Sequence, residues 1–293
     1  MRGAACMYII LTLFAAFCYS LMSFLIKLAS EYVNDSTITF FRFFSALIML
    51  MPFYYLSGKP TLKTKKPFIH LIRGIFGFLM FTLFSISLKY LPVENALALN
   101  STYPFFIPII LFIFFKEKIT GSIIIGTIIG FIGVYIIANP SVEGYMNWAA
   151  ILALLSAVFS AASNVTIRFL RGSENSFSIV FYFFLFSTIV SFVYLLIAGM
   201  DALNFKLIGL LIGIALTSVA SQQCLSYVLK FLHPNIVSIL MYSSIIFGFL
   251  FSWIFFGQTP SLSQTIGTFF ILFGGVIIIK YKSKTNEKLK TAS

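Results

Sequence analysis

Long apolar runs separated by short polar breaks repeat along the whole chain. Each run has about 18 or more residues, enough to cross a hydrocarbon layer roughly 30 Å thick. The runs lack the alternation of barrel strands, and hydrocarbon cannot satisfy free backbone amides, so each is predicted to be an α-helix. The predicted spans are 5–26, 37–56, 68–88, 95–115, 121–138, 147–167, 177–199, 207–229, 235–256 and 262–279. The predicted fold is therefore an all-α integral membrane protein with ten transmembrane helices.

The composition supports a lipid environment. Of the 293 residues 60% are hydrophobic and 10% are charged, whereas soluble domains carry about a quarter charged residues. The first run is longer than the roughly 7 to 15 apolar residues of a signal peptide, so we expect a true span. The net charge of +12 would suggest a nucleic-acid partner in a soluble protein. Here Lys and Arg occupy short loops, which predicts a role in topology and no nucleic-acid partner.

Positive charge is concentrated on one side of the predicted spans. That side carries Arg2, Lys59, Lys63, Lys65, Lys66, Lys116, Lys118, Arg168, Arg171, Lys230, Lys280, Lys282, Lys284, Lys288 and Lys290. The other side carries Lys27, Lys89, Lys206 and most of the acids. Short loops rich in Lys and Arg stay in the cytoplasm. Both termini are thus predicted to be cytoplasmic, in a bacterial cytoplasmic (inner) membrane.

The two halves of the chain match without a gap when one is shifted by 141 residues. Lys89-Tyr-Leu aligns with Lys230-Phe-Leu, and Gly126-Thr aligns with Gly267-Thr. Five spans per half is an odd number, so the second half is predicted to cross the membrane inverted. The predicted domains are the repeats 1–140 and 141–280, followed by a basic cytoplasmic tail, 281–293. Inverted repeats are typical of alternating-access carriers, which hold their substrate near the midplane.

Several short motifs resemble those of the drug/metabolite transporter superfamily, and within it the ten-helix EamA-like carriers. The motifs are Phe40-Phe-Arg42-Phe-Phe-Ser45, Arg73-Gly74, Tyr90-Leu-Pro92, Asn95-Ala-Leu-Ala98, Pro104, Pro108, Lys116-Glu117 and Gly126 to Gly133. The resemblance covers essentially the whole chain and implies two EamA-like five-helix repeats and a transport function. Gly257-Gln258 stands where the family commonly has an acidic residue, so no role is carried over to that position.

A narrower resemblance concerns the first hundred residues. The segment Phe40 to Phe44, followed by 60–74, is similar to S-adenosylmethionine uptake carriers of obligate intracellular bacteria. This similarity implies S-adenosylmethionine, or an amino-acid-like solute, as the transported metabolite. Aromatic faces would hold an adenine or a sulfonium group by stacking and cation–π contact, and an Arg would take the carboxylate.

Polar residues inside apolar runs indicate where such a substrate would bind. Prolines 104 and 108 predict a kink in span 95–115, and kinked helices often line transporter sites. The predicted substrate-binding residues are Arg42, Asn100, Ser101, Tyr103, Gln222, Gln223, Tyr242 and Ser243, and the predicted gating or pathway residues are Arg73, Tyr19 and Asn164. The alternative for the neutral residues is interhelical hydrogen bonding. The alternative for either Arg is a structural partner at a helix end.

The eight acidic residues are all expected in loops, at span ends or in the tail, with Glu94 just before span 95–115. Proton-driven carriers usually keep an ionisable group in the pathway. We therefore expect exchange or facilitated diffusion rather than proton coupling. The nearest candidate exception is His70, which we expect to be an interfacial anchor at the cytoplasmic mouth of span 68–88.

No catalytic constellation is visible in the sequence. The three cysteines lie apart without CxxC spacing, His residues are not clustered, and no acid pair lies within a span, so neither enzyme activity nor a metal or cofactor is expected. Gly126-x-x-x-Gly130 fits either a homodimer contact or packing inside one bundle. The predicted function is a secondary transporter that moves a small polar metabolite by alternating access. The alternative is a multidrug or metabolite exporter.

Overall fold

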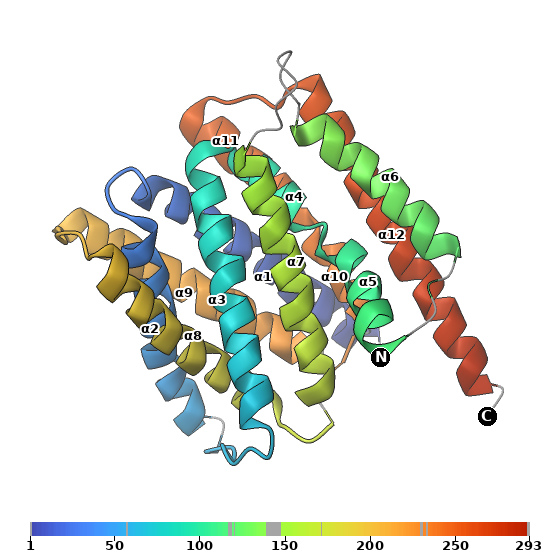
Figure 1. Cartoon of the computed structure of the whole chain (residues 1–293), viewed down its shortest axis with the longest axis horizontal. Coiled ribbons are helices and arrows are strands. Elements are labelled where there is room, and N and C mark those ends of the chain that lie inside the picture. The colour runs from blue at the N-terminus through green and yellow to red at the C-terminus, as the bar shows by residue number, and fades with distance from the viewer. Residues whose placement is uncertain are drawn as a thin grey trace.

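The computed structural model describes residues 2–56, 58–116, 119, 121–138, 148–170, 172–228, 231–232 and 234–291, and over these residues it is helical without strands. The helices are α1 (Arg2–Ala29), α2 (Asp35–Leu56), α3 (Pro67–Tyr90), α4 (Val93–Asn100), α5 (Tyr103–Phe115), α6 (Gly121–Ala138), α7 (Trp148–Leu170), α8 (Ser176–Ala198), α9 (Phe205–Val228), α10 (Pro234–Met241), α11 (Ser243–Phe256) and α12 (Leu262–Thr291). Figure 1 shows the start of α1 and the end of α12 toward the same side of the molecule.

Ten apolar segments account for the predicted spans. Eight are long and apolar enough to cross a membrane, and α6 and α12 carry shorter apolar stretches, Gly121–Ile137 and Leu262–Ile278. The predicted all-α membrane fold is confirmed. The predicted boundary between the halves, at 140/141, lies outside the described residues, so the domain limits stay a prediction. Beyond the predicted span end at 279, α12 continues to Thr291, because its Lys-rich end contains good helix formers and no Pro or Gly.

The fourth span of each half is broken into two helices at equivalent positions. In the first half Ser101 and Thr102 form a turn, with φ −67° and ψ −1° at Ser101. Pro104 follows, and it has no amide hydrogen to bond the carbonyl of Asn100. In the second half α10 ends at Met241 and α11 begins at Ser243, although no proline lies at this break. The kink predicted from proline is thus a full interruption of the helix. A second interruption lies at the equivalent position of the other half, where no proline explains it.

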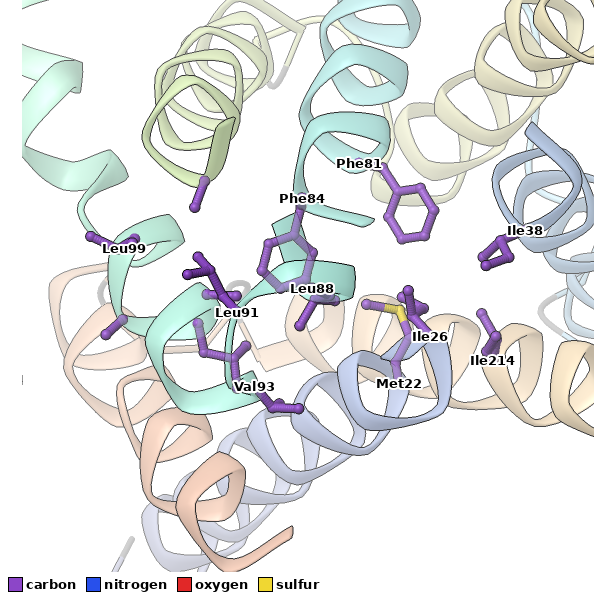
Figure 2. Close-up of a cluster of buried hydrophobic side chains, with 14 of the residues drawn as sticks. Met22, Ile26, Ile38, Phe81, Phe84, Leu88, Leu91, Val93, Leu99 and Ile214 are labelled. Carbon is purple, nitrogen blue, oxygen red and sulfur yellow. The ribbon is translucent and has the colours of Figure 1, made fainter. Parts of the chain in front are cut away.

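Apolar side chains meet where α1, α3, α4 and α9 converge (Figure 2). Those at the centre are at most 6% exposed: Met22, Ile26, Phe81, Phe84, Leu88, Leu91, Val93 and Ile214. Lipid tails are as apolar as these side chains, so helix association rests on close packing and polar contacts. In this structure the core packs α4 against α1 and α3.

The helices α6 and α12 run side by side along one edge of the molecule (Figure 1). A Cβ added at Gly133 would lie 2.4 Å from the carbonyl oxygen of Gly267, and one at Gly274 would lie 2.4 Å from that of Gly126. The backbones therefore touch directly, and we call these four glycines the glycine clasp. Gly130 faces Phe105. Both glycines of Gly126-x-x-x-Gly130 thus pack within the chain, and a homodimer stays a prediction.

Two sets of loop contacts join α2 to α8, one at each end of the molecule. We call the two ends of the molecule the Asn34 end and the Lys63 end, after a residue in a loop at each. At the Asn34 end, Asp201 accepts hydrogen bonds from the Asn34 amide nitrogen (2.6 Å) and from Thr37 Oγ1 (3.2 Å). At the Lys63 end, the Thr61 carbonyl accepts from Asn175 Nδ2 (2.8 Å) and Ser178 Oγ (2.7 Å). The 141-residue shift relates Asn34 to Asn175 and Thr37 to Ser178. Equivalent residues thus make equivalent ties at both ends.

The glycine clasp predicts a steep dependence of stability on side-chain size. We expect Gly133→Ala to destabilise the protein by about 1 to 3 kcal/mol, because the added methyl group forces two backbones apart. Thermal unfolding in detergent, followed by size-exclusion chromatography, measures the effect. Gly209→Ala in α9 is the matched control, because a Cβ there meets nothing within 4 Å. Equal melting temperatures for both variants would show that the clasp does not hold the helices.

Candidate functional site

A chain of hydrogen bonds links α1, α4 and α7 at the break between α4 and α5. The Tyr19 hydroxyl donates to Asn100 Oδ1 at 3.0 Å, and Asn100 Nδ2 donates to Ser156 Oγ at 2.8 Å. Ser156 in turn donates to the Ala153 carbonyl. The break places Asn100 at the end of α4, where its side chain reaches two other helices. Two predicted site residues, Tyr19 and Asn100, are therefore in direct contact, and Ser156 is a partner that the sequence analysis did not single out.

Arg42 is a buried cation held by aromatic rings. Its guanidinium carbon lies 3.8 Å from the ring centroid of Phe81 and 4.6 Å from that of Phe43. The side chain is 2% exposed, and its Nε and Nη1 atoms have no hydrogen-bond partner among the described residues. Tyr19 acts on it electrostatically. The aromatic cage was not foreseen, because with 37 Phe in the chain no single one stands out.

The two broken spans, α4/α5 and α10/α11, come close to each other near Tyr19. Tyr103, the first residue of α5, is within electrostatic reach of both Tyr19 and Tyr242. Tyr242 lies in the second break and is 6% exposed, and Gly275 of α12 leaves room for its hydroxyl. Of the two predicted serines, Ser101 is buried in the first break and Ser243 donates to the Leu240 carbonyl at 2.7 Å. We call Tyr19, Arg42, Asn100, Tyr103 and Tyr242 the tyrosine cluster.

Arg73 lies at the other end of an aromatic path from Arg42. Its guanidinium carbon is 4.8 Å from the Phe183 ring centroid, and its side chain is 5% exposed. Phe43 contacts both Phe81 and Phe183, with centroids 5.5 Å and 5.9 Å apart. Two buried guanidinium groups are thus connected by touching rings between α2, α3 and α8.

Six of the eleven predicted residues are outside the tyrosine cluster, among them Asn164, Gln222 and Gln223. Asn164 is exposed and donates to the Ser160 carbonyl of its own helix at 2.9 Å. Gln222 and Gln223 are half-buried on α9, and Gln223 Nε2 has no partner among the described residues. Their neighbour Ser221 donates to the Ala15 carbonyl at 2.9 Å, which fixes this part of α9 on α1.

Two ionisable side chains lie deeper than the sequence analysis expected. Glu94 is the second residue of α4, is 2% exposed, and accepts a hydrogen bond from Ser252 of α11. His70 is fully buried, with its ring 4.6 Å from that of Tyr182, and is no interfacial anchor. The sequence analysis placed Glu94 just before span 95–115, and the structure places it in the first turn of that span. Its position at a span end agrees with the expectation, whereas its burial was not foreseen.

The described residues contain no group of three or more His, Cys, Asp and Glu side chains that would hold a metal ion. The chemistry of the tyrosine cluster is that of binding. A guanidinium group offers several donors in a fixed fork that fits a carboxylate or phosphate, and the hydroxyl and amide groups beside it accept and donate hydrogen bonds.

Comparisons with known proteins agree with a transport function. Over 271 residues the chain is 27% identical to the pseudopaline exporter CntI of Pseudomonas aeruginosa, covering 92% of this chain and 93% of the relative. It is 31% identical over 180 residues to an S-adenosylmethionine uptake transporter of Rickettsia felis, covering 57% and 61%. A riboflavin transporter of Rhizobium johnstonii is 25% identical over 254 residues, covering 87% and 84%. The Rickettsia similarity thus extends well past the first hundred residues.

The fold also has a known counterpart. A solved protein structure that is 16% identical matches with a TM-score of 0.66 over 92% of this chain and 95% of its own, which bears on the fold alone. Residues 7–139 and 147–280 each match the model of the EamA-like transporter family. The two matches cover most of the chain. The chain therefore belongs to the EamA-like transporter family, and it is a multi-pass membrane transporter rather than an enzyme.

Proposed function

We propose that this transporter moves a small polar metabolite that carries a carboxylate group, with S-adenosylmethionine foremost and an amino-acid-like solute next. The tyrosine cluster forms its binding site, and Ser101, Ser243, Gln222 and Gln223 contribute polar groups around it. The protein lies in the bacterial cytoplasmic membrane. Alternating access arises from movement of the broken helices α4/α5 and α10/α11 between two fixed edges, the glycine clasp and the tied pair α2 and α8.

Arg42 is the observation that carries this proposal. A cation buried in a membrane protein is costly unless an anion or a set of hydrogen-bond acceptors accompanies it. Among the described residues Arg42 contacts the Phe43 and Phe81 rings, Tyr19 acts on it electrostatically, and its Nε and Nη1 atoms have no hydrogen-bond partner. A substrate carboxylate would supply the missing acceptors, and the Phe and Tyr faces beside it suit an adenine or a sulfonium group. Arg73, reached through Phe43 and Phe183, is the next guanidinium along the same path.

Alternating access is supported by a difference between the two ends. At the Asn34 end α4 packs against α11, whereas the pair related by the 141-residue shift, α5 and α10, makes no comparable contact in the described residues. Contact at one end only is the expected arrangement of a carrier that closes one side at a time. Exchange or facilitated diffusion stays our prediction for the transport mode, and Glu94, buried at the end of its span, is the carboxylate that bears on it.

Export is the second candidate. The relative that aligns with 92% of the chain is a pseudopaline exporter, so the same site would load from the cytoplasm. A multidrug exporter would need a pocket that is mainly aromatic, and the buried guanidinium of Arg42 disfavours cargo that has no anionic group. The two directions differ in which face of the carrier binds substrate with the higher affinity.

The charge distribution predicts that the Lys63 end is cytoplasmic, since Lys59, Lys63, Lys65 and Lys66 lie there. Single cysteines at Lys63 and at Glu31, both exposed, are introduced into a variant without Cys6, Cys18 and Cys224. In intact cells a membrane-impermeant thiol reagent should label position 31 and leave position 63 unlabelled until the cells are permeabilised. Labelling of position 63 from outside would reverse the proposed orientation.

The role of Arg42 predicts a substrate preference. We expect proteoliposomes that contain the wild-type protein to bind S-adenosylmethionine at least about tenfold more tightly than its decarboxylated analogue, because a paired buried carboxylate is worth a few kcal/mol. Arg42→Met should lose most of this difference, and Arg42→Lys should lose part of it, since it keeps the charge without the fork. Competition against labelled substrate during exchange measures both affinities.

A matched control for these variants is Arg73→Met, which removes a second buried guanidinium outside the tyrosine cluster. It should change the transport rate more than the ratio of the two affinities. If Arg42→Met preserves the full preference for the carboxylated compound, Arg42 is a packing residue and the site lies elsewhere.

The hydrogen-bond chain predicts different effects for two amides. Asn100→Ala leaves the Tyr19 hydroxyl without its acceptor and should weaken substrate binding by about 1 to 3 kcal/mol. Gln222→Ala should have the smaller effect, because no described contact joins Gln222 to the tyrosine cluster. Membrane expression and melting temperature are measured alongside affinity, which separates lost contacts from misfolding. Wild-type affinity in Asn100→Ala would remove Asn100 from the site.

A further inference from the structure

Glu94 lies in a close contact between α4 and α11, in which its carboxyl group accepts a hydrogen bond. Gly248 of α11 lets α4 approach so closely that an added Cβ would lie 3.3 Å from the Glu94 Cα atom and 2.8 Å from Leu97 Cδ1. One turn further on, Ser252 is 1% exposed and donates its hydroxyl to Glu94. Leu91 and Val93, close to Glu94 in the chain, are buried in the apolar cluster of Figure 2. We call this contact the α4–α11 gate.

Lys27 of α1 is the charged group that acts on Glu94, but it is engaged elsewhere. Its ammonium group donates to the carbonyl of Leu88 at 3.1 Å and also to the carbonyl of Leu91, and no ion pair joins it to Glu94 in the described residues. The two carbonyls solvate the Lys27 ammonium group, and Glu94 and then exposed Glu31 act on it electrostatically. The Ser252 hydroxyl group carries no charge and cannot neutralise a carboxylate. The direct hydrogen-bond partners of the Glu94 carboxyl group are thus one hydroxyl group and its own helix, and Lys27 acts on it without an ion pair.

The other helices around the gate supply no further neutralising group. Neither α11 nor the described part of α7 up to Ile167 contains a titratable side chain, and the same holds for the described side chains of α12. Tyr135 of α6 is 66% exposed and faces away. At the end of α3, Lys89 acts on Asp35 and Tyr90 packs on Trp148. A proton is the remaining ligand that can remove the charge when the gate is closed.

The gate chemistry is confined to one end of the molecule. The 141-residue shift relates Glu94 to Asn235, Gly248 to Ile107 and Ser252 to Leu111. None of these equivalents binds a proton near neutral pH. A one-sided proton site is what a carrier needs if one of its two closing steps is to respond to protons and the other is not.

We propose that Glu94 is a proton-binding site of the α4–α11 gate, so that the gate closes with a proton on the Glu94 carboxyl group. When α4 and α11 separate, the carboxylate meets water and releases the proton. When they close, the carboxyl group is buried on Gly248 and Ser252, whose hydroxyl oxygen accepts the added O–H. The inference deepens the proposed function, because it assigns the gate to the transport cycle and links closure to protons at the Asn34 end.

The test measures the gate without any substrate. Spin labels on cysteines at Lys89 and at Ile254, both exposed, report the distance between the ends of α3 and α11 in lipid nanodiscs, in a variant without native cysteines. Binding of one proton on closure shifts the ratio of open to closed populations by up to about tenfold per pH unit. We expect the short distance to dominate at about pH 6 and the long one to gain population toward about pH 8.

Three variants complete the experiment. Glu94→Gln, permanently neutral, should keep the short distance at both pH values, and Glu94→Asp should respond to pH like the wild type. Glu31→Gln is the matched control, because it removes an exposed carboxylate that also acts on Lys27, and it should leave the response intact. A wild-type distance that does not change with pH, or an equal change in Glu94→Gln, would overturn the proposal.

Transport measurements separate this inference from the proposed function. Glu94→Gln should exchange labelled for unlabelled S-adenosylmethionine more slowly than the wild type, because its gate opens less often, and an imposed proton gradient should no longer alter its uptake. If wild-type protein moves no S-adenosylmethionine but the distance responds to pH through Glu94, the substrate assignment fails and the proton site stands. If exchange runs in the wild type and uptake through Glu94→Gln still responds to the gradient as in the wild type, the proton site fails and the transport function stands.

Discussion

Hydrocarbon offers no hydrogen-bond partner to the backbone, and this constraint organises the whole molecule. The spans are helical because a helix satisfies its amides internally. The chain interrupts this pattern at two equivalent places, Ser101-Thr102 and Tyr242, and both lie inside the bundle. At these breaks the side chains of Asn100, Tyr103 and Tyr242 come together with Tyr19. A group of buried polar side chains thus lies where the backbone departs from a continuous helix.

The two halves share a backbone plan but not their chemistry. Asn34 and Asn175 make matching ties at opposite ends, and the clasp glycines meet in matching pairs. The charged residues break the match: Arg42 is equivalent to Phe183, Arg73 to Ile214 and Glu94 to Asn235. Symmetry therefore supplies the shared frame, and the differences between the halves supply the proposed binding group, Arg42, and the proposed gate carboxylate, Glu94.

Sequence alone predicted the frame far better than the site. Span length and loop charge indicated ten helices, because both depend on the bilayer and not on which side chains touch. The polar residues Tyr19 and Asn100 were singled out, since polar groups are rare within spans. Their partner Ser156 was not, because small hydroxyl residues are common in these helices. The Phe81 and Phe43 cage was hidden by the abundance of Phe, and the burial of Glu94 was not foreseen because a Pro before it resembles a solvated helix start.

The glycine clasp has a consequence for the origin of the chain. Gly126 meets Gly274 and Gly133 meets Gly267, and the 141-residue shift turns each of these pairs into the other. Each helix thus presents the same pair of glycines to the other helix. Such a contact is self-complementary, as in a two-fold dimer of identical subunits. A single ancestral five-helix unit would have carried both glycines on one helix. Two copies inserted in opposite orientations would have formed the same surface before any gene fusion joined them.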